Sequence, residues 1–447
     1  MPSRLSFRLL PFVVSLTLAY GTSAQAQSLQ DLYDAARGHD ATFISAKAQF
    51  EANLAKANQA LGGILPNIAL SASASRTDFS LRPDGQPTAT SRMFGTGTAA
   101  VTLTQPLYRP AAWAAYRQGG QQLQQAAAQY EAAEQDLLVR VSQAYFDVLT
   151  SEDSLAFVKA QKQAVGEQLA SAKRNFEVGT ATITGVRDAQ ARFDLTTAQE
   201  IAAENDLRIK RLALDLVVGL QNAQPKRLAN RAQLVEPPKE PVDAWVSQSE
   251  ANSPAVKQAL LAYEVAKLEV DKANAGHKPT LDAQVSYAGT RNVNGNAVST
   301  TGSHVFNPSA AVVLNMPLFA GLTTMYRVRE ATALENKAQS DLEAAKRNTA
   351  QATRTAYYGL MAGLSQVKAY EAAEASSQSA LDANKLGYSV GVNINIDVLN
   401  SQSQLYQTKR DLAKARYDVL VGNLKLRQAA GTLTPQDLTS INSLLAP

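Results

Sequence analysis

The chain contains no cysteine among its 447 residues. Disulfide bonds and thiol chemistry are therefore excluded, as is a lipid-modified N-terminal cysteine of the kind that many bacterial envelope proteins carry. Strong charge is also missing, because the formal net charge is +4 and falls to +2 once Arg4 and Arg8 are removed with residues 1–26. So small a charge does not predict nucleic acid as a partner.

Long apolar runs are missing as well. After residue 26 no stretch of about 18 consecutive apolar residues occurs, so no transmembrane helix is predicted. Residues 1–26 have the pattern of a secretory signal peptide, with Arg4 and Arg8 before the apolar segment "LLPFVVSLTLAY" and a small-residue cleavage site at "AQA". The alternative, a retained anchor, is disfavoured because the apolar run is short. The chain is therefore predicted to be exported, and any membrane-spanning part must consist of strands.

Recognisable catalytic chemistry is the third absence. The three histidines, His39, His277 and His304, do not have the spacing of metal ligands. No cysteine nucleophile, GxSxG motif or phosphate-binding loop is present. We therefore predict no enzymatic activity, no metal and no cofactor.

What the chain does contain is an internal repeat. "LPNIALSASA" corresponds to "KPTLDAQVSYA", "VTLTQPLY" to "VVLNMPLF", and "AYF" to "AYY", always about 212 residues apart. Each half has the pattern helix, strand, loop, strand, long helix, turn, helix. The predicted organisation is a first repeat at 27–220, a linker at 221–245, a second repeat at 246–433 and a C-terminal tail at 434–447.

Four strands are predicted, at about 65–79, 96–107, 279–292 and 305–319. In the third, Leu281, Val285 and Tyr287 alternate with the polar Asp282 and Gln284. Such alternation is typical of a half-buried strand and equally of a membrane barrel with lipid outside and water inside. Four strands are too few to close a barrel, and open strand edges are not tolerated in lipid. If these strands span a membrane, several copies must share one barrel.

The helical segments carry heptad repeats. In the last helix one apolar seam is large and a second seam is small; these are Val398, Leu405, Leu412 and Val419, and Ser401, Thr408, Ala415 and Gly422. Heptads indicate coiled-coil packing, and the small seam would let a second helix approach closely. Residues 110–176 would span about 100 Å as one helix. A break is expected at 150–153 ("TSED"), which has the pattern of a helix start. A periplasmic coiled-coil adaptor or tether is the alternative that these helices leave open.

Four segments bring in a known family: "AYFDVL", "RNFEVGTATITGV", "GYSVGVNINIDVL" and "AAGTLTPQDL". With the signal peptide and the duplicated pattern, they make the chain resemble the TolC family of outer-membrane channel proteins over 27–433. The resemblance implies a mostly helical fold with membrane strands. It implies a homotrimer with one 12-stranded outer-membrane β-barrel, continued by a periplasmic barrel of long coiled-coil helices.

The function that the resemblance implies is that of an outer-membrane exit duct in efflux or type I secretion. It would pass drugs, small molecules or unfolded proteins, and its helical tip would open like an iris. The implied partners are a periplasmic adaptor protein, an inner-membrane ABC, RND or MFS pump, and outer-membrane lipid. The linker and the tail would lie in an equatorial belt, and a large part of the protein would be periplasmic.

The resemblance also assigns the pore constriction. The second-repeat helix would supply acidic rings, of which Asp397 matches the first and Asn400 replaces the second. Asn393 stands where family members carry an arginine, and Tyr388 is retained. In the first repeat an aspartate that helps to hold the tip closed is replaced by Gly185, after Thr184.

The two turns of the tip would contact the adaptor through paired "VG" sequences, Val178–Gly179 and Val390–Gly391. Because acidic partners are lost, we expect a tip without a closing salt-bridge network. A purely structural role is the alternative for Asp397, as an acid in the first turn of a helix capped by Asn395. The two roles are compatible.

Overall fold

The computed structural model describes residues 27–82, 84–85, 90–229 and 236–446. The predicted signal peptide, residues 1–26, lies outside them. The first half of the chain contains α1 (Leu29–His39), α2 (Ala41–Leu61), β1 (Asn67–Leu81), β2 (Thr90–Tyr108), α3 (Pro110–Glu177) and α4 (Ile183–Val218). The second half contains α5 (Val242–Asn252), α6 (Pro254–Asn274), β3 (Thr280–Val293), β4 (Ser303–Asn315), α7 (Thr323–Ser389), α8 (Asn395–Ala429) and α9 (Gln436–Asn442).

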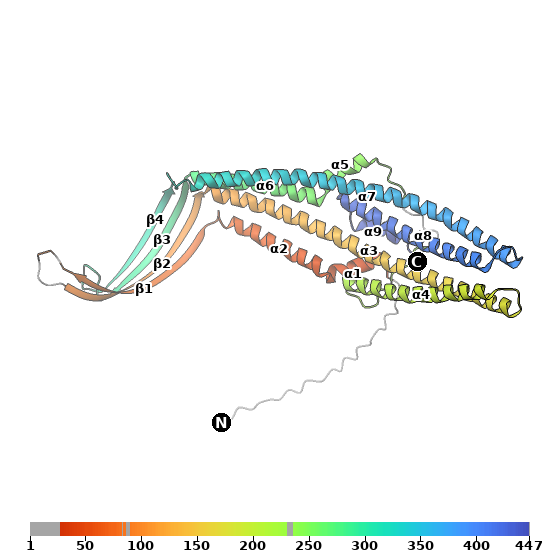
Figure 1. The fold of residues 1–447 in the computed structure, drawn as a ribbon. Coiled ribbons are helices and arrows are strands. Elements are labelled where there is room, and N and C mark those ends of the chain that lie inside the picture. The colour runs from red at the N-terminus through yellow and green to blue at the C-terminus, as the bar shows by residue number, and fades with distance from the viewer. Residues whose placement is uncertain (1–26, 83, 86–89, 230–235, 447) are drawn as a thin grey trace, which may run out of the picture.

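The strands form one antiparallel sheet at one end of an elongated molecule (Figure 1). Their order is β1-β2-β3-β4, so the two halves of the chain meet where β2 pairs with β3. Among the described residues β1 and β4 have no strand beyond them, so the sheet has two open edges. Two strand bounds differ from those expected: β2 begins before residue 96, and β4 ends at Asn315 instead of at 319.

A partly buried ion pair joins the sheet to the helices. Arg109, which immediately precedes α3, donates from Nε and from an Nη atom to the two carboxylate oxygens of Asp282 on β3, both at 2.7 Å. Asp282 is 9% exposed, so the paired geometry compensates for the cost of removing its charge from water. The first half of the chain is thus attached to the second at the base of the sheet.

The long helices lie side by side in the order α4, α3, α8, α7 (Figure 1). α3 lies between α4 and α8, and α8 lies between α3 and α7, so the two repeats meet along the α3–α8 contact. The large heptad residues Val398, Leu405 and Leu412 of α8 are buried against α7, and Leu399 is buried against α3. None of the described helices is long and apolar enough to cross a bilayer.

The break expected at 150–153 does not exist, because α3 is one helix of 68 residues. The residues that indicated a helix start have other partners. The Thr150 hydroxyl donates to the carbonyl of Phe146 one turn earlier, and the Ser151 hydroxyl donates to Asp206 of α4. Asp153 accepts from the hydroxyl of Tyr417 on α8. Ser151 and Asp153 thus form contacts between helices and Thr150 bonds within α3, so none of the three caps a new helix.

The main core surrounds the middle of the helices. It gathers large buried side chains from α1, α3, α4, α8 and α9, among them Tyr33, Tyr145, Phe146, Leu214, Leu420, Leu424 and Leu438. The segment after α4 and the C-terminal end close over this region through short bridges of Pro225 with Gln27 and of Leu228 with Leu445. This core holds the helices together in the middle of the molecule, while the helix ends at the two turns farthest from the sheet extend beyond it.

Candidate functional site

The candidate site is the tip of the helices farthest from the sheet, where α3 turns into α4 and α7 turns into α8 (Figure 1). Both turns need a glycine, because Gly179 has φ +77° and Gly391 has φ +79°. The preceding valines expose 72% (Val178) and 66% (Val390) of their surface. One exposed valine side chain therefore lies at the outermost point of each helical hairpin.

Asp397 lies in the first turn of α8 and is partly exposed. Its carboxylate accepts the backbone N–H of Ile394 at 3.2 Å, so one oxygen satisfies a free donor at the helix start. Asn395 does not cap α8 as the structural alternative assumed, since the helix begins at that residue and Ile394 precedes it as the cap. The capping contact leaves the second carboxylate oxygen without a hydrogen-bond partner among the described residues.

Asn395 makes the contact that the sequence patterns do not predict. It is 8% exposed, and its amide nitrogen donates to the carbonyl of Gly185 at 3.3 Å. Its amide oxygen accepts from the side chain of Gln168 on α3. We call Gln168, Asn395 and Gly185 the tip bridge. It ties the start of α8 to both helices of the first repeat.

Asn400 and Tyr388 also contact the first repeat. The oxygen of Asn400 accepts from the guanidinium of Arg192 on α4 at 2.8 Å, and the hydroxyl of Tyr388 accepts from the amide of Asn175 on α3 at 3.2 Å. Asn393 instead stays within the second repeat, where it donates to the oxygen of Asn384 at 2.7 Å. With the two contacts of Asn395, four hydrogen bonds among the described residues connect the repeats at the tip.

Thr184 and Gly185 stand at the start of α4. The cap of this helix is Thr182, whose hydroxyl accepts the N–H of Gly185 at 3.4 Å and lies 2.7 Å from the hydroxyl of Thr184. Thr184 itself is exposed. Gly185 takes part in the tip bridge only through its carbonyl, a role that any residue can perform, so its identity gave no signal.

Asp397 forms no ion pair with any described residue of the tip, and the contacts between the repeats there are formed by neutral amides, a hydroxyl and one arginine. Further up, the wall does contain ion pairs between helices, such as Lys162 with Glu200 at 2.6 Å. The sequence could have shown the amide character of the tip, since Asn and Gln are frequent in "GYSVGVNINIDVLNSQSQL". The partners could not be predicted, because Gln168 lies 227 residues from Asn395.

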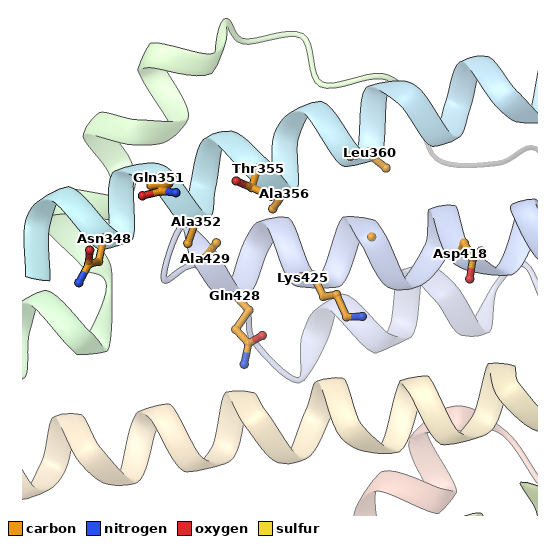
Figure 2. A pocket seen from close by; sticks show the side chains of 12 residues that line it. Asn348, Gln351, Ala352, Thr355, Ala356, Leu360, Asp418, Lys425, Gln428 and Ala429 are labelled. Atoms are coloured by element: carbon orange, nitrogen blue, oxygen red, sulfur yellow. The ribbon is translucent and has the colours of Figure 1, made fainter.

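A groove runs between α7 and α8 above the tip (Figure 2). Its small residues include Ala352 and Gly359 on α7 and Gly422 and Ala429 on α8. Gly422 belongs to the small seam of α8. Among the residues that the structure describes, no three His, Cys, Asp or Glu side chains lie together as a metal site would require.

An open-edged sheet, a wall of paired long helices and a narrow helical tip define the class of outer-membrane channel subunits. The profile of the family described as "Outer membrane efflux protein" matches residues 32–220 and 245–432. Outer membrane protein TolC of Vibrio cholerae is 33% identical over 98% of this chain and 98% of its own length. The alkaline protease secretion protein AprF of Pseudomonas aeruginosa is 30% identical over 93% of this chain and 86% of its own.

A solved structure, the Campylobacter jejuni CmeC outer membrane channel, has the same fold with a TM-score of 0.77. It is 15% identical and the match covers 99% of this chain and 98% of that one. The chain belongs to the outer membrane efflux protein family. It is an exit duct of the outer membrane with a large periplasmic helical part, and the alternative of a periplasmic adaptor is thereby set aside.

Proposed function

We propose that three copies of this chain form one duct, with a shared 12-stranded barrel above and a ring of 12 helices below. The observation that supports this is the pair of open ends in each copy. The sheet ends at β1 and β4, and the helix layer ends at α4 and α7. In lipid each unpaired backbone group costs several kcal/mol, so β4 of one copy must pair with β1 of the next.

α4 carries the matching signal on the helical side. One face of it is buried against α3 and contains Ala189, Thr196, Leu207 and Leu214. The opposite face carries exposed apolar residues at heptad spacing, which are Leu195, Ala202, Ile209, Leu212 and Leu216. We call this second set the outer seam of α4. A helix that is apolar on two opposite faces needs two helical neighbours, and one copy supplies only α3.

The tip is the proposed gate. With three copies around an axis, the free oxygens of three Asp397 carboxylates would form a ring at the narrowest point. Such a ring favours cations and binds divalent ones more strongly than monovalent ones. Asn400 in place of a second acid, and Asn393 in place of an arginine, leave this gate held by amide contacts instead of an ionic network.

The proposed partners follow from the same geometry. Val178 and Val390 offer small apolar contacts at the outermost turns, which suits docking of a helical hairpin from a periplasmic adaptor. The adaptor would connect the duct to an inner-membrane ABC, RND or MFS pump, and outer-membrane lipid would surround the strands. Because relatives include both TolC and a protease secretion protein, the proposed cargo covers small molecules and unfolded proteins.

Single-channel recording tests the gate. In planar bilayers, Asp397→Ala should weaken block by divalent cations about tenfold or more, because removing the acidic ring removes most of the local negative charge. The wild-type channel should in turn be less sensitive to block than a TolC channel with two acidic rings. Asp382→Ala, an exposed acid on the adjacent helix, is the matched control and should leave block unchanged. Equal block of wild type and Asp397→Ala would show that Asp397 does not line the pore.

A further inference from the structure

One face of the sheet has the composition of a surface that contacts lipid. Side chains on one face of all four strands are predominantly apolar near the helices. Following the pairing register, this face contains Ile68 and Leu70 of β1, Val101 and Leu103 of β2, Val285 and Tyr287 of β3, and Phe306, Ala310 and Val312 of β4. The opposite face carries Ser71, Ser73, Thr98, Thr102, Gln284, Ser286 and Ser309. In a barrel the apolar face points to lipid and the polar face to water.

The apolar face changes character at a defined height. Arg291 of β3 is paired with Gly97 of β2 on one side and with His304 of β4 on the other. From Leu281 at the helical end of β3 to Arg291 is a rise of about 33 Å along the strand, or about 25 Å of membrane thickness at the usual strand tilt. That is the height of the apolar band of outer-membrane barrels. Arg291 and His304 therefore lie at its outer boundary, where lipid headgroups begin.

A shallow hollow of about 420 Å³ accompanies the basic pair, because two neighbouring positions have no side chain. It is lined by Gly97, Gly289, Arg291, His304 and Phe306. The ring of Phe306 covers Gly289, where an added Cβ would lie 3.4 Å from it, whereas an added Cβ at Gly97 would meet nothing within 4 Å. The hollow thus combines a cation, an imidazole, an aromatic wall and an open floor. We call it the headgroup notch.

Within the part of the chain that the structure describes, the guanidinium of Arg291 has no ion-pair or hydrogen-bond partner, and both Arg291 and His304 are exposed. The nearest acid on this face of β1, Asp78, lies beside Arg76, which itself contacts Met93. The notch spans β2, β3 and the edge strand β4. A second copy that pairs with β1 or β4 would extend the sheet edge to edge and leave this face uncovered.

We propose that the headgroup notch binds the phosphate of an outer-leaflet lipid, with the acyl chains of that lipid lying along the apolar face below. This rests on the proposed membrane orientation of the strands. A phosphate would accept charge-assisted hydrogen bonds from Arg291 and His304, and the open space at Gly97 would admit it close to the backbone. Such a contact fixes the depth of each copy in the bilayer.

Native mass spectrometry of the purified full-length protein tests the proposal. The probes are phosphatidic acid and the diacylglycerol with the same acyl chains, which differ only in the phosphate. Wild type should retain phosphatidic acid about fivefold more than diacylglycerol, as expected for charge-assisted contacts at a partly solvated site. Arg291→Gln should lose most of that preference. Arg347→Gln, which removes the same charge from an exposed position on α7, should keep it.

Gly97→Leu supplies a second variant that keeps Arg291 and fills the notch. It should reduce retention of phosphatidic acid as Arg291→Gln does. Inorganic phosphate should not displace the bound lipid at millimolar concentration, because it lacks the acyl chains. Equal retention of the two lipids by wild type, unchanged retention by both variants, or displacement by inorganic phosphate would each overturn the proposal.

Membrane fractionation of the same variants separates this inference from the proposed function. Wild type and Arg291→Gln should both reach the outer membrane as trimers. A wild-type chain that stays soluble or monomeric would refute the proposed duct itself. Trimers in the outer membrane without a phosphate preference would refute the headgroup notch alone.

Discussion

The carboxyl group of Asp153 lies within the layer of long helices. It accepts the hydroxyl of Tyr417 at 2.8 Å across the α3–α8 contact. Burial raises the pKa of Asp153 above its usual range, and the hydrogen bond from Tyr417 lowers the pKa only in part. The pKa of the Tyr417 hydroxyl is raised by its own burial and by the charge of Asp153. The folded protein therefore binds a proton at Asp153 more tightly than the unfolded chain does.

A pH dependence follows at the residue scale. Because the folded-state pKa of Asp153 is raised, its contribution to stability is fully present below the pKa of the unfolded chain, is lost as pH rises through the folded-state pKa, and stays constant above it. Asp153→Asn keeps an acceptor for Tyr417 without the charge. We expect this variant to be more stable than wild type at pH 8 by on the order of 1 kcal/mol, and the difference should shrink in acid. Thermal unfolding of the purified protein at several pH values measures it.

Asp153→Ala is the control for this prediction. It also removes the charge, but it leaves the buried Tyr417 hydroxyl without its acceptor, so it should lower stability at every pH. An offset of Asp153→Asn that does not change with pH, or a loss of stability at pH 8, would contradict the assignment.

The elements show how far sequence reasoning reaches. The duplication, the four strands and the heptads of α8 are visible as local periods, and these periods specify the class of fold. The break predicted in α3 was wrong because "TSED" has the local pattern of a helix start, whereas Ser151 and Asp153 bind residues of α4 and α8. The prediction that Asn395 caps α8 was wrong for the same reason, because its side chain binds Gln168 and Gly185 of the first repeat. Polar groups were assigned to their own helix when their partners lie far away in the sequence.

At the same scale the tip bridge makes a testable claim. Asn395 connects the start of α8 to α3 and α4, so Asn395→Ala removes a link between the repeats and leaves the Gly185 carbonyl without that donor. Losing a partly buried hydrogen bond of this kind costs about 1 kcal/mol. We expect a larger fraction of open time in single-channel recordings at low voltage.

Asn384→Ala is the matched control. The Asn384 amide contacts Asn393 and Ser401, which belong to the same helical hairpin, so its loss does not separate the repeats. This variant should open less often than Asn395→Ala. The reverse order, or no effect of Asn395→Ala, would show that the tip is held closed by other contacts.

The whole molecule makes its own prediction through the outer seam of α4. Ile209 is 53% exposed in a single copy, and we propose that the neighbouring copy covers it. Ile209→Glu should leave the fold of one copy intact but place a charge in the contact between copies, at a cost of several kcal/mol per site. Less trimer should then be found by gel mobility with and without heating. Gln199→Glu adds the same charge at an exposed position outside the seam and should leave the trimer unchanged. A stable Ile209→Glu trimer would place the contact elsewhere.

The unpaired edges of β1 and β4 have a genetic consequence. A ring of three copies closes only when every copy has both edges intact. One damaged copy therefore prevents two intact copies from forming a closed ring. If a cell makes intact and damaged chains in equal amounts and they mix at random, only about one eighth of closed three-membered rings contain intact chains alone. A damaging substitution at either edge should therefore act dominantly over a normal copy of the gene. Damage confined to the signal sequence should be recessive, because such chains never reach the place of assembly.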